Sequence, residues 1–226
     1  MIVSISQPTL FPWLGYFDII NKSDIFVFLN DAQFEKRSWQ TRNRIKNTSS
    51  QNSVIWLKIP IKKTGLNTLI KDVIIDNSKD WKNHHIKTME ACYGQRVHNL
   101  EWVLGHYKKE WDNLADFNIE FIKQCCKFLG IKTKFELSSE LKVKGKRTEK
   151  LANICSLLKG DLYLSTIGAK EYLNREKEFF EKKNIKIVYH EYNHPEYKQK
   201  DGNFISNLSI LDLLLNLGDD AKKIYH

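Results

Sequence analysis

Hydrophobic residues near the start of the chain form two short runs, and each run ends in polar residues. The first run, 1–6, stops at Gln7, and the second, 25–29, stops just before Asp31. Between the two runs, Gly15 opens a segment with the apolar spacing of a helix. Strand, helix and strand in this order form the first unit of an α/β sheet. The pattern predicts an α/β fold with a Rossmann-like, mostly parallel sheet.

The rest of the chain continues this alternation around a helical block. Apolar residues recur every three or four positions over 79–129, which predicts a helical insertion. Further elements are a polar loop at 46–53, strands at 54–61, 162–165 and 186–192, a helix that follows 166–169 and runs through 182, and an apolar helix at 209–217. A chain of this length suits one domain, 1–226, with a helical subdomain around 79–129.

Composition narrows the class of protein. Hydrophobic residues make up 42% of the chain, which is typical of a folded globular protein, and the net charge of +9 favours anionic partners. No basic leader or span of about 20 apolar residues is present. The four cysteines form no CxxC pair, so we expect a cytoplasmic protein with free thiols. No metal-ligand spacing is present, and the sequence specifies neither a cofactor nor an oligomeric state.

Polar residues at the ends of the first two strands are the main candidates for a site. Ligands of open α/β sheets bind outside the carboxyl ends of the strands, where Gln7, Asp31 and Gln33 are expected. Amide and carboxylate groups can hydrogen-bond a sugar hydroxyl or an amine. Asp31 could act as a base if burial raises its pKa. The alternative is that these side chains bind the backbone of turns.

A basic segment follows Gln33. It contains Lys36, Arg37, Arg42 and Arg44, interleaved with Trp39. Arginine can hold a phosphate through two parallel hydrogen bonds, and an aromatic ring can stack on a base. The segment is therefore a candidate contact for a nucleotide diphosphate, with an exposed basic loop as the alternative. No helix-turn-helix, zinc-finger or RNA-recognition signature favours nucleic acid.

A third group lies near the end of the chain. Residues 190–194 match the HExxH string of zinc peptidases, but that motif requires a helix. Strand-like residues precede it and Pro195 follows it, so we reject this interpretation. His194 is instead a candidate proton acceptor, because a neutral imidazole is available near pH 7. Packing of the ring against the turn is the alternative.

Several segments resemble one protein family in order along nearly the whole chain. QPTLFPWLGYFDII, NDAQFEKRSWQTRNRI, HPEYKQ and LSILDLLLNLG are similar to the WbqC-like family, with Asn30 where a second Asp is common. The resemblance implies a bacterial protein of surface-polysaccharide and O-antigen assembly. It also implies aminoacyl or acyl transfer to a nucleotide-linked amino sugar. In that reaction Asp31 or His194 would accept the amine proton, with Tyr197 and Gln199 among the substrate-binding residues.

The N-terminal unit also resembles the HxGH nucleotidyltransferases, pantothenate synthetase in particular. Trp13 and Tyr16 take the places of the two histidines around Gly15, and neither can carry a positive charge. This resemblance implies a nucleotide pocket in which adenylyl transfer is lost or altered. Ser165, Thr166 and Gly168 are similar to the phosphate-binding helix start of that superfamily. Free backbone N–H groups at such a helix start favour an anion.

Three other functions remain open at this point. A non-catalytic module that binds a nucleotide or nucleotide-sugar would bind without turnover. Nucleotidyl transfer would release pyrophosphate. A nucleic-acid-binding protein would lose affinity steeply as salt is raised.

Overall fold

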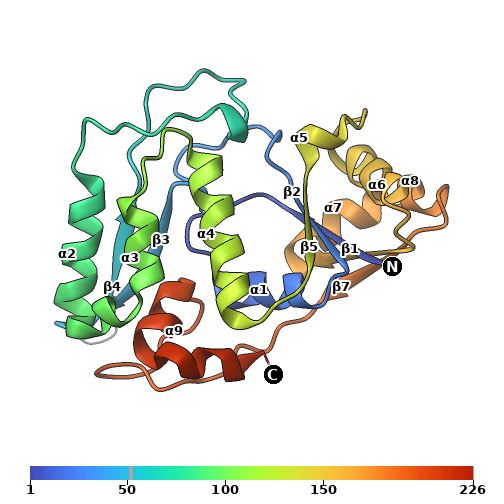
Figure 1. Cartoon of the computed structure of the whole chain (residues 1–226). Coiled ribbons are helices and arrows are strands. Elements are labelled where there is room, and N and C mark those ends of the chain that lie inside the picture. Colours follow the sequence, from blue (N-terminus) through green and yellow to red (C-terminus); the bar gives the residue numbers. More distant parts are fainter. Residues whose placement is uncertain (51–52, 226) are drawn as a thin grey trace. The chain divides into compact units, whose positions relative to one another are not determined.

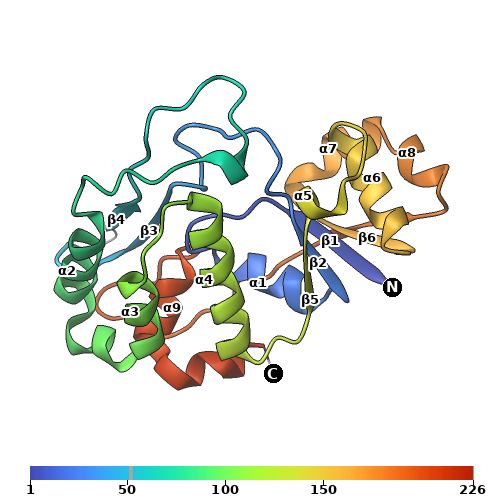
Figure 2. The same ribbon diagram turned by 45° about the horizontal axis from the view of Figure 1, so that its top comes forward.

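The structure is a computed structural model of the chain, and it describes residues 1–50 and 53–225. Two views of the ribbon are shown in Figures 1 and 2. The chain divides into two compact units, and each unit is built from three segments. Unit 1 comprises Met1–Gln7, Gly15–Ala32 and Ile131–Asn193, and unit 2 comprises Pro8–Leu14, Gln33–Gly130 and His194–His226. The organisation of 1–226 as one domain stays a prediction.

Unit 1 is an α/β unit around a five-stranded sheet with the order β5-β2-β1-β6-β7. All its strand pairs are parallel, so the predicted Rossmann-like fold class is confirmed. The strands are β1 (Ile2–Ser6), β2 (Ile25–Phe28), β5 (Lys134–Leu137), β6 (Leu162–Thr166) and β7 (Lys186–His190). The helices are α1 (Leu14–Asn21), α5 (Ser138–Leu141), α6 (Arg147–Leu157), α7 (Lys170–Arg175) and α8 (Glu178–Glu181).

Helices cover both faces of this sheet, as a parallel sheet requires. Because side chains alternate along a strand, Val3 and Ser4 of β1 point to opposite faces. Val3 belongs to a buried cluster that includes residues of α6, α7 and α8. On the other face, Phe26 of β2 packs edge-to-face on Tyr16 of α1, with ring centroids 5.4 Å apart. Figure 2 shows α6, α7 and α8 grouped together, apart from α1.

The strand order changes direction at β1. The strands that follow β1 in sequence, β2 and then β5, lie to one side of it, whereas β6 and β7 lie to the other. In open α/β sheets the crevice outside the carboxyl ends at such a switch point is the usual ligand site. Here Gln7 follows β1 and Ile167 follows β6 at that point.

Unit 2 combines a hairpin with helices around an aromatic core. It contains β3 (Arg42–Asn47), paired antiparallel with β4 (Ser53–Lys58), and α2 (Trp81–Tyr93), α3 (Glu101–Lys108), α4 (Leu114–Leu129) and α9 (Ile210–Leu217). The ring of Phe11 packs against those of Phe117 and Phe121, and the Asn43 amide donates 2.9 Å hydrogen bonds to the carbonyls of Leu10 and Phe11. These contacts tie segment Pro8–Leu14 to the hairpin.

Sequence patterns located most of the unit 2 helices but missed part of its hairpin. Helices α2, α3 and α4 lie in the 79–129 segment that the periodicity indicated. The predicted loop at 46–53 is wrong at its start, because Lys46 and Asn47 belong to β3. Residues 51–52 of that loop lie outside the described residues. The four cysteines are buried free thiols.

Gly160 gives a direct test of packing against β1. An added Cβ would lie 2.6 Å from Cγ2 of Val3, a stiff and fully buried side chain. We expect Gly160→Ala to lower the free energy of unfolding by about 1–3 kcal/mol. Gly168→Ala is the control, because its added Cβ would meet no atom within 4 Å, and we expect a change within about 0.5 kcal/mol. Urea denaturation compares them, and equal stabilities would contradict this packing.

Candidate functional site

Asp31 lies at the carboxyl edge of the unit 1 sheet and forms an ion pair there. Its carboxylate accepts hydrogen bonds from Ser138 Oγ at 2.5 Å and Lys150 Nζ at 2.6 Å. Burial opposes ionisation of Asp31, but the hydrogen bonds from Lys150 and Ser138 and the Lys150 charge outweigh it, so its pKa is lowered. A role for Asp31 as a base requires burial to raise its pKa. The expectation of a raised pKa is wrong. The carboxylate instead holds Lys150 in place.

His190 forms a second polar pair at the same edge, which sequence reasoning missed. Its Nε2 lies 2.5 Å from Oδ2 of Asp18 on α1, and the His190 residue is 8% exposed. His190 ends β7, and the segment up to residue 199 contains no helix. The HExxH string therefore does not adopt the zinc-peptidase geometry. Among the residues that the structure describes, no group of three or more His, Cys, Asp or Glu side chains could hold a metal ion.

The residues that prompted the nucleotidyltransferase comparison are divided between the two units. Tyr16 is 7% exposed, and its hydroxyl donates to the Gln7 carbonyl at 3.0 Å. Gly15 is buried in the first turn of α1. Trp13 belongs to unit 2, whereas Tyr16 belongs to unit 1. Tyr16 therefore packs against the sheet, and its role in substrate binding stays a prediction.

The helix predicted after β6 is shorter than expected. Ser165 is buried, whereas Thr166 and Gly168 are exposed. A 3₁₀ turn, Ile167–Ala169, follows β6 and leads into the six-residue helix α7. The single helix predicted to run through 182 is wrong, because the chain leaves helical geometry at Glu176, between α7 and α8. A short helix aligns few peptide dipoles, so this segment is a weaker anion site than the sequence indicated.

His194 and Trp13 lie together in unit 2. The two rings are stacked, with centroids 6.4 Å apart and planes 12° apart. Nδ1 of His194 lies 2.9 Å from the carbonyl oxygen of Pro195 and must donate to it, so Nε2 of the neutral ring is the basic nitrogen. Burial lowers the pKa of His194, and the Pro195 contact and Asp212 charge oppose this only in part. The ring is neutral at pH 7 and can accept a proton.

Tyr197 and Gln199 position this segment from inside the protein. The Tyr197 hydroxyl and Gln199 Nε2 donate to Oδ2 of Asp212 on α9, at 2.7 and 2.9 Å. Tyr93 donates to the other carboxylate oxygen at 2.5 Å. Asp212 is fully buried, and burial raises its pKa despite these hydrogen bonds. The structure thus gives the two predicted substrate-binding residues contacts to a buried carboxylate, which fix the segment after His194.

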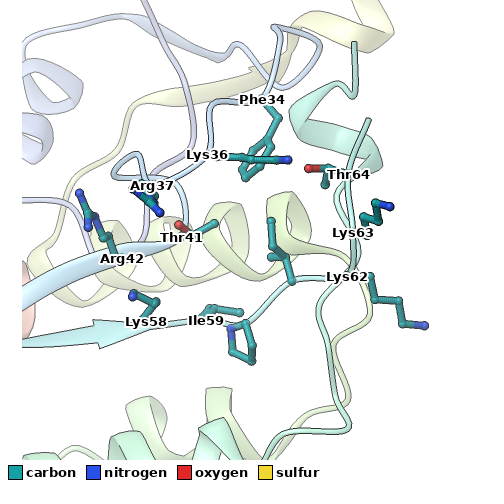
Figure 3. Close-up of a pocket in the computed structure, with 12 residues that line it drawn as sticks. Phe34, Lys36, Arg37, Thr41, Arg42, Lys58, Ile59, Lys62, Lys63 and Thr64 are labelled. Atoms are coloured by element: carbon teal, nitrogen blue, oxygen red, sulfur yellow. The ribbon is translucent and has the colours of Figure 1, made fainter. Parts of the chain in front are cut away.

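A basic pocket of about 340 Å³ is formed within unit 2 (Figure 3). Six cationic side chains line it, and no Asp or Glu is among its twelve lining residues, all of which the structure describes. The cations are Lys36, Arg37, Arg42, Lys58, Lys62 and Lys63. Lysine and arginine side chains without carboxylate neighbours favour an anionic ligand. This basic pocket is the clearest candidate binding site in unit 2.

The predicted basic segment contributes to this pocket only in part. Arg37 and Arg42 line it, but Arg44, two residues further along β3, does not. Gln33 is exposed, and its Nε2 donates to the carbonyl of Leu66 at 2.7 Å. Sequence reasoning missed three lysines, Lys58, Lys62 and Lys63. Pairing of β3 with β4 places Lys58 opposite Arg42, and this register is not readable from local spacing.

Comparison with known proteins identifies the family. The profile of the WbqC-like protein family matches residues 7–224. The chain belongs to this family. The WbqC-like match confirms the resemblance seen in the sequence. The matched residues include the lining of the basic pocket and His194. The uncharacterized protein Rv1507c of Mycobacterium tuberculosis is similar, with 33% identity over 225 residues, 97% of this chain and 95% of that protein. No solved structure is significantly similar.

Among the helices that residues 1–50 and 53–225 of this WbqC-like protein form, none combines the length and the apolar character that crossing a bilayer requires.

The Asp31–Lys150 ion pair predicts a pH-dependent contribution to stability. Because its pKa in the folded state is lowered, the pair stabilises the fold above the ordinary value of 3.8. This contribution is lost as pH falls through the lower folded-state value. We expect Asp31→Asn to lower the free energy of unfolding at pH 7 by about 1–3 kcal/mol, and by less as pH falls below about 4.

Asp219→Asn provides the control for this measurement. The Asp219 carboxylate pairs with Lys222 but is 85% exposed, so its loss should change stability by less than about 0.5 kcal/mol. Urea denaturation across pH 3–7 measures both variants. A loss in Asp31→Asn that is the same at pH 3 and pH 7 would refute the role assigned to its charge.

Proposed function

We propose that this protein is a cytoplasmic transferase of bacterial surface-glycan assembly. It attaches an aminoacyl or acyl group to the amine of a nucleotide-linked sugar. The observation that carries the proposal is the basic pocket, which six cationic residues line without an Asp or Glu among its lining residues. A nucleotide-linked sugar carries a diphosphate, which lysine and arginine side chains bind well. The family to which the chain belongs is consistent with this substrate class.

Two local features support the pocket as a ligand site. Arg37 has a positive φ of 62°, a conformation that disfavours residues other than glycine. Strained backbone of this kind is often found at ligand sites. In the described part of the chain, Oγ1 of Thr64, another lining residue, is buried and has no hydrogen-bond partner. A phosphate oxygen would supply the acceptor for this hydroxyl.

His194 supplies the group that an amine acceptor needs. In the proposed reaction, the amine nitrogen attacks the acyl carbon, and its proton passes to Nε2 of His194. The bond between the acyl carbon and the leaving group breaks, and His194 returns the proton to that group. Contacts within unit 2 also connect His194 to the hairpin of β3 and β4. Trp13, which stacks on His194, forms a backbone bridge with Ser209, and the Ser209 N–H donates to the Arg44 carbonyl at 3.0 Å.

Arg37→Gly separates ligand binding from folding. Glycine accepts the positive φ of this position, so we expect the free energy of unfolding to change by less than about 1 kcal/mol. Loss of the cation should raise the dissociation constant of a UDP- or dTDP-linked amino sugar about tenfold, as measured by calorimetry. Lys183→Ala removes an exposed lysine of unit 1 and should leave binding unchanged. Equal affinities of Arg37→Gly and the unmodified protein would argue against the pocket.

The state of His194 predicts the pH profile of transfer. Since burial lowers its pKa from 6.5, kcat/KM should stay flat from pH 8 to about 6.5 and fall only at lower pH. We expect His194→Gln to reduce turnover by about 10²–10⁴-fold while the nucleotide-linked sugar still binds. His84→Gln, at an exposed position on α2, is the control. Full turnover in His194→Gln would remove this residue from the mechanism.

A further inference from the structure

Two tryptophan side chains stand exposed on the surface of unit 2. Trp39 is 49% exposed, and Trp56 on β4 is 41% exposed. Their rings are stacked, with centroids 5.6 Å apart and planes 30° apart. Large apolar rings gathered in contact with water commonly mark a binding surface. The flat faces of indole rings favour a ligand that is itself a planar ring.

Arg42 connects this tryptophan pair with the basic pocket. Its guanidinium group lies over the Trp56 ring, 4.7 Å from the centroid, and the same residue lines the pocket. Across the hairpin, Arg44 is paired with Trp56 and Arg42 with Lys58. Because alternate residues of a strand share a face, these four side chains project from the same face of the hairpin. Arg42 therefore contacts the tryptophan pair, where a planar ring could stack, and also lines the basic pocket, where an anion could bind.

We propose that Trp39 and Trp56 form a stacking surface for the base of a nucleotide whose phosphates occupy the basic pocket. This proposal rests on the proposed function, since it specifies the nucleotide part of the same substrate. A nucleotide carries a planar base and a phosphate chain in one molecule, which matches the two adjoining surfaces. Stacking on aromatic side chains tolerates every base. The surface therefore selects nucleotides over bare phosphates, without selecting strongly among bases.

Calorimetric titrations with pyrophosphate, UDP and ADP test this proposal. UDP and ADP should both bind at least about tenfold more tightly than pyrophosphate. Trp39→Leu and Trp56→Leu should each weaken UDP binding about tenfold and change pyrophosphate binding less than twofold. Trp56→Phe, which keeps an aromatic face, should retain most of the UDP affinity.

Tyr172→Leu is the matched control for these variants. Tyr172 is an aromatic residue of unit 1 with a similar exposure of 47%, and its replacement should leave UDP binding unchanged. Because Trp39 and Trp56 are about half exposed, the variants should fold, and thermal melting verifies this. Trp56→Phe reports on the ring in any case, because it keeps most of the packed volume.

The outcomes separate this proposal from the function on which it rests. Unchanged UDP affinity in both tryptophan-to-leucine variants would overturn the stacking surface but leave the pocket as a phosphate site. Binding of neither pyrophosphate nor UDP to the unmodified protein would overturn both. UDP binding that depends on the tryptophans, without transfer to any amino sugar, would support the surface and count against the transferase. Far tighter binding of an oligothymidylate than of UDP, with steep salt dependence, would overturn the mononucleotide ligand.

Discussion

The parallel pairing of β1 with both β2 and β6 is the interaction on which the rest of the structure depends. It places Val3 beside Ile25 on one side and beside Tyr163 on the other, although Tyr163 is 160 positions away in sequence. A central parallel strand must be covered on both faces, so the chain has to supply α1 early and α6 to α8 late. Parallel neighbours also need long connections, and the connection between β2 and β5 contains most of unit 2.

The carboxylates of the two units and the cations of the basic pocket differ in the partners that the fold provides for them. At the edge of the unit 1 sheet, two carboxylates have a cationic or imidazole partner: Asp31 has Lys150, and Asp18 has His190. In unit 2, the fully buried Asp212 accepts hydrogen bonds from three neutral side chains, and the charge of Lys46 also acts on it. These groups are satisfied within the fold, as buried polar groups usually are. The basic pocket is different, because its lining contains cations and no acid among the described residues, so it offers uncompensated charge to a ligand.

The sequence predicted those parts that depend on local pattern. Continuous apolar runs located β1 and β2, because strands buried on both faces contain few polar residues. Strand β3 was missed because Ile45 is its only apolar residue, so the sequence shows no alternation of apolar and polar positions there. The pocket was found only through Lys36, Arg37 and Arg42, since Lys58 joins it by strand register. The direction of the Asp31 pKa shift was not foreseen because its partner Lys150 lies 119 residues away.

The contrast between Asp31 and His194 bears on which residue can act as a base in this protein. A carboxylate beside a cation has a lowered pKa, as Asp31 shows, and a weaker base is poorly matched to an amine proton. A carboxylate placed directly beside the cations of the basic pocket would be subject to the same effect. An imidazole responds in the opposite sense, because neighbouring positive charge and burial both favour its neutral form. A histidine is therefore the side chain whose function as a proton acceptor is compatible with a cation-rich substrate site.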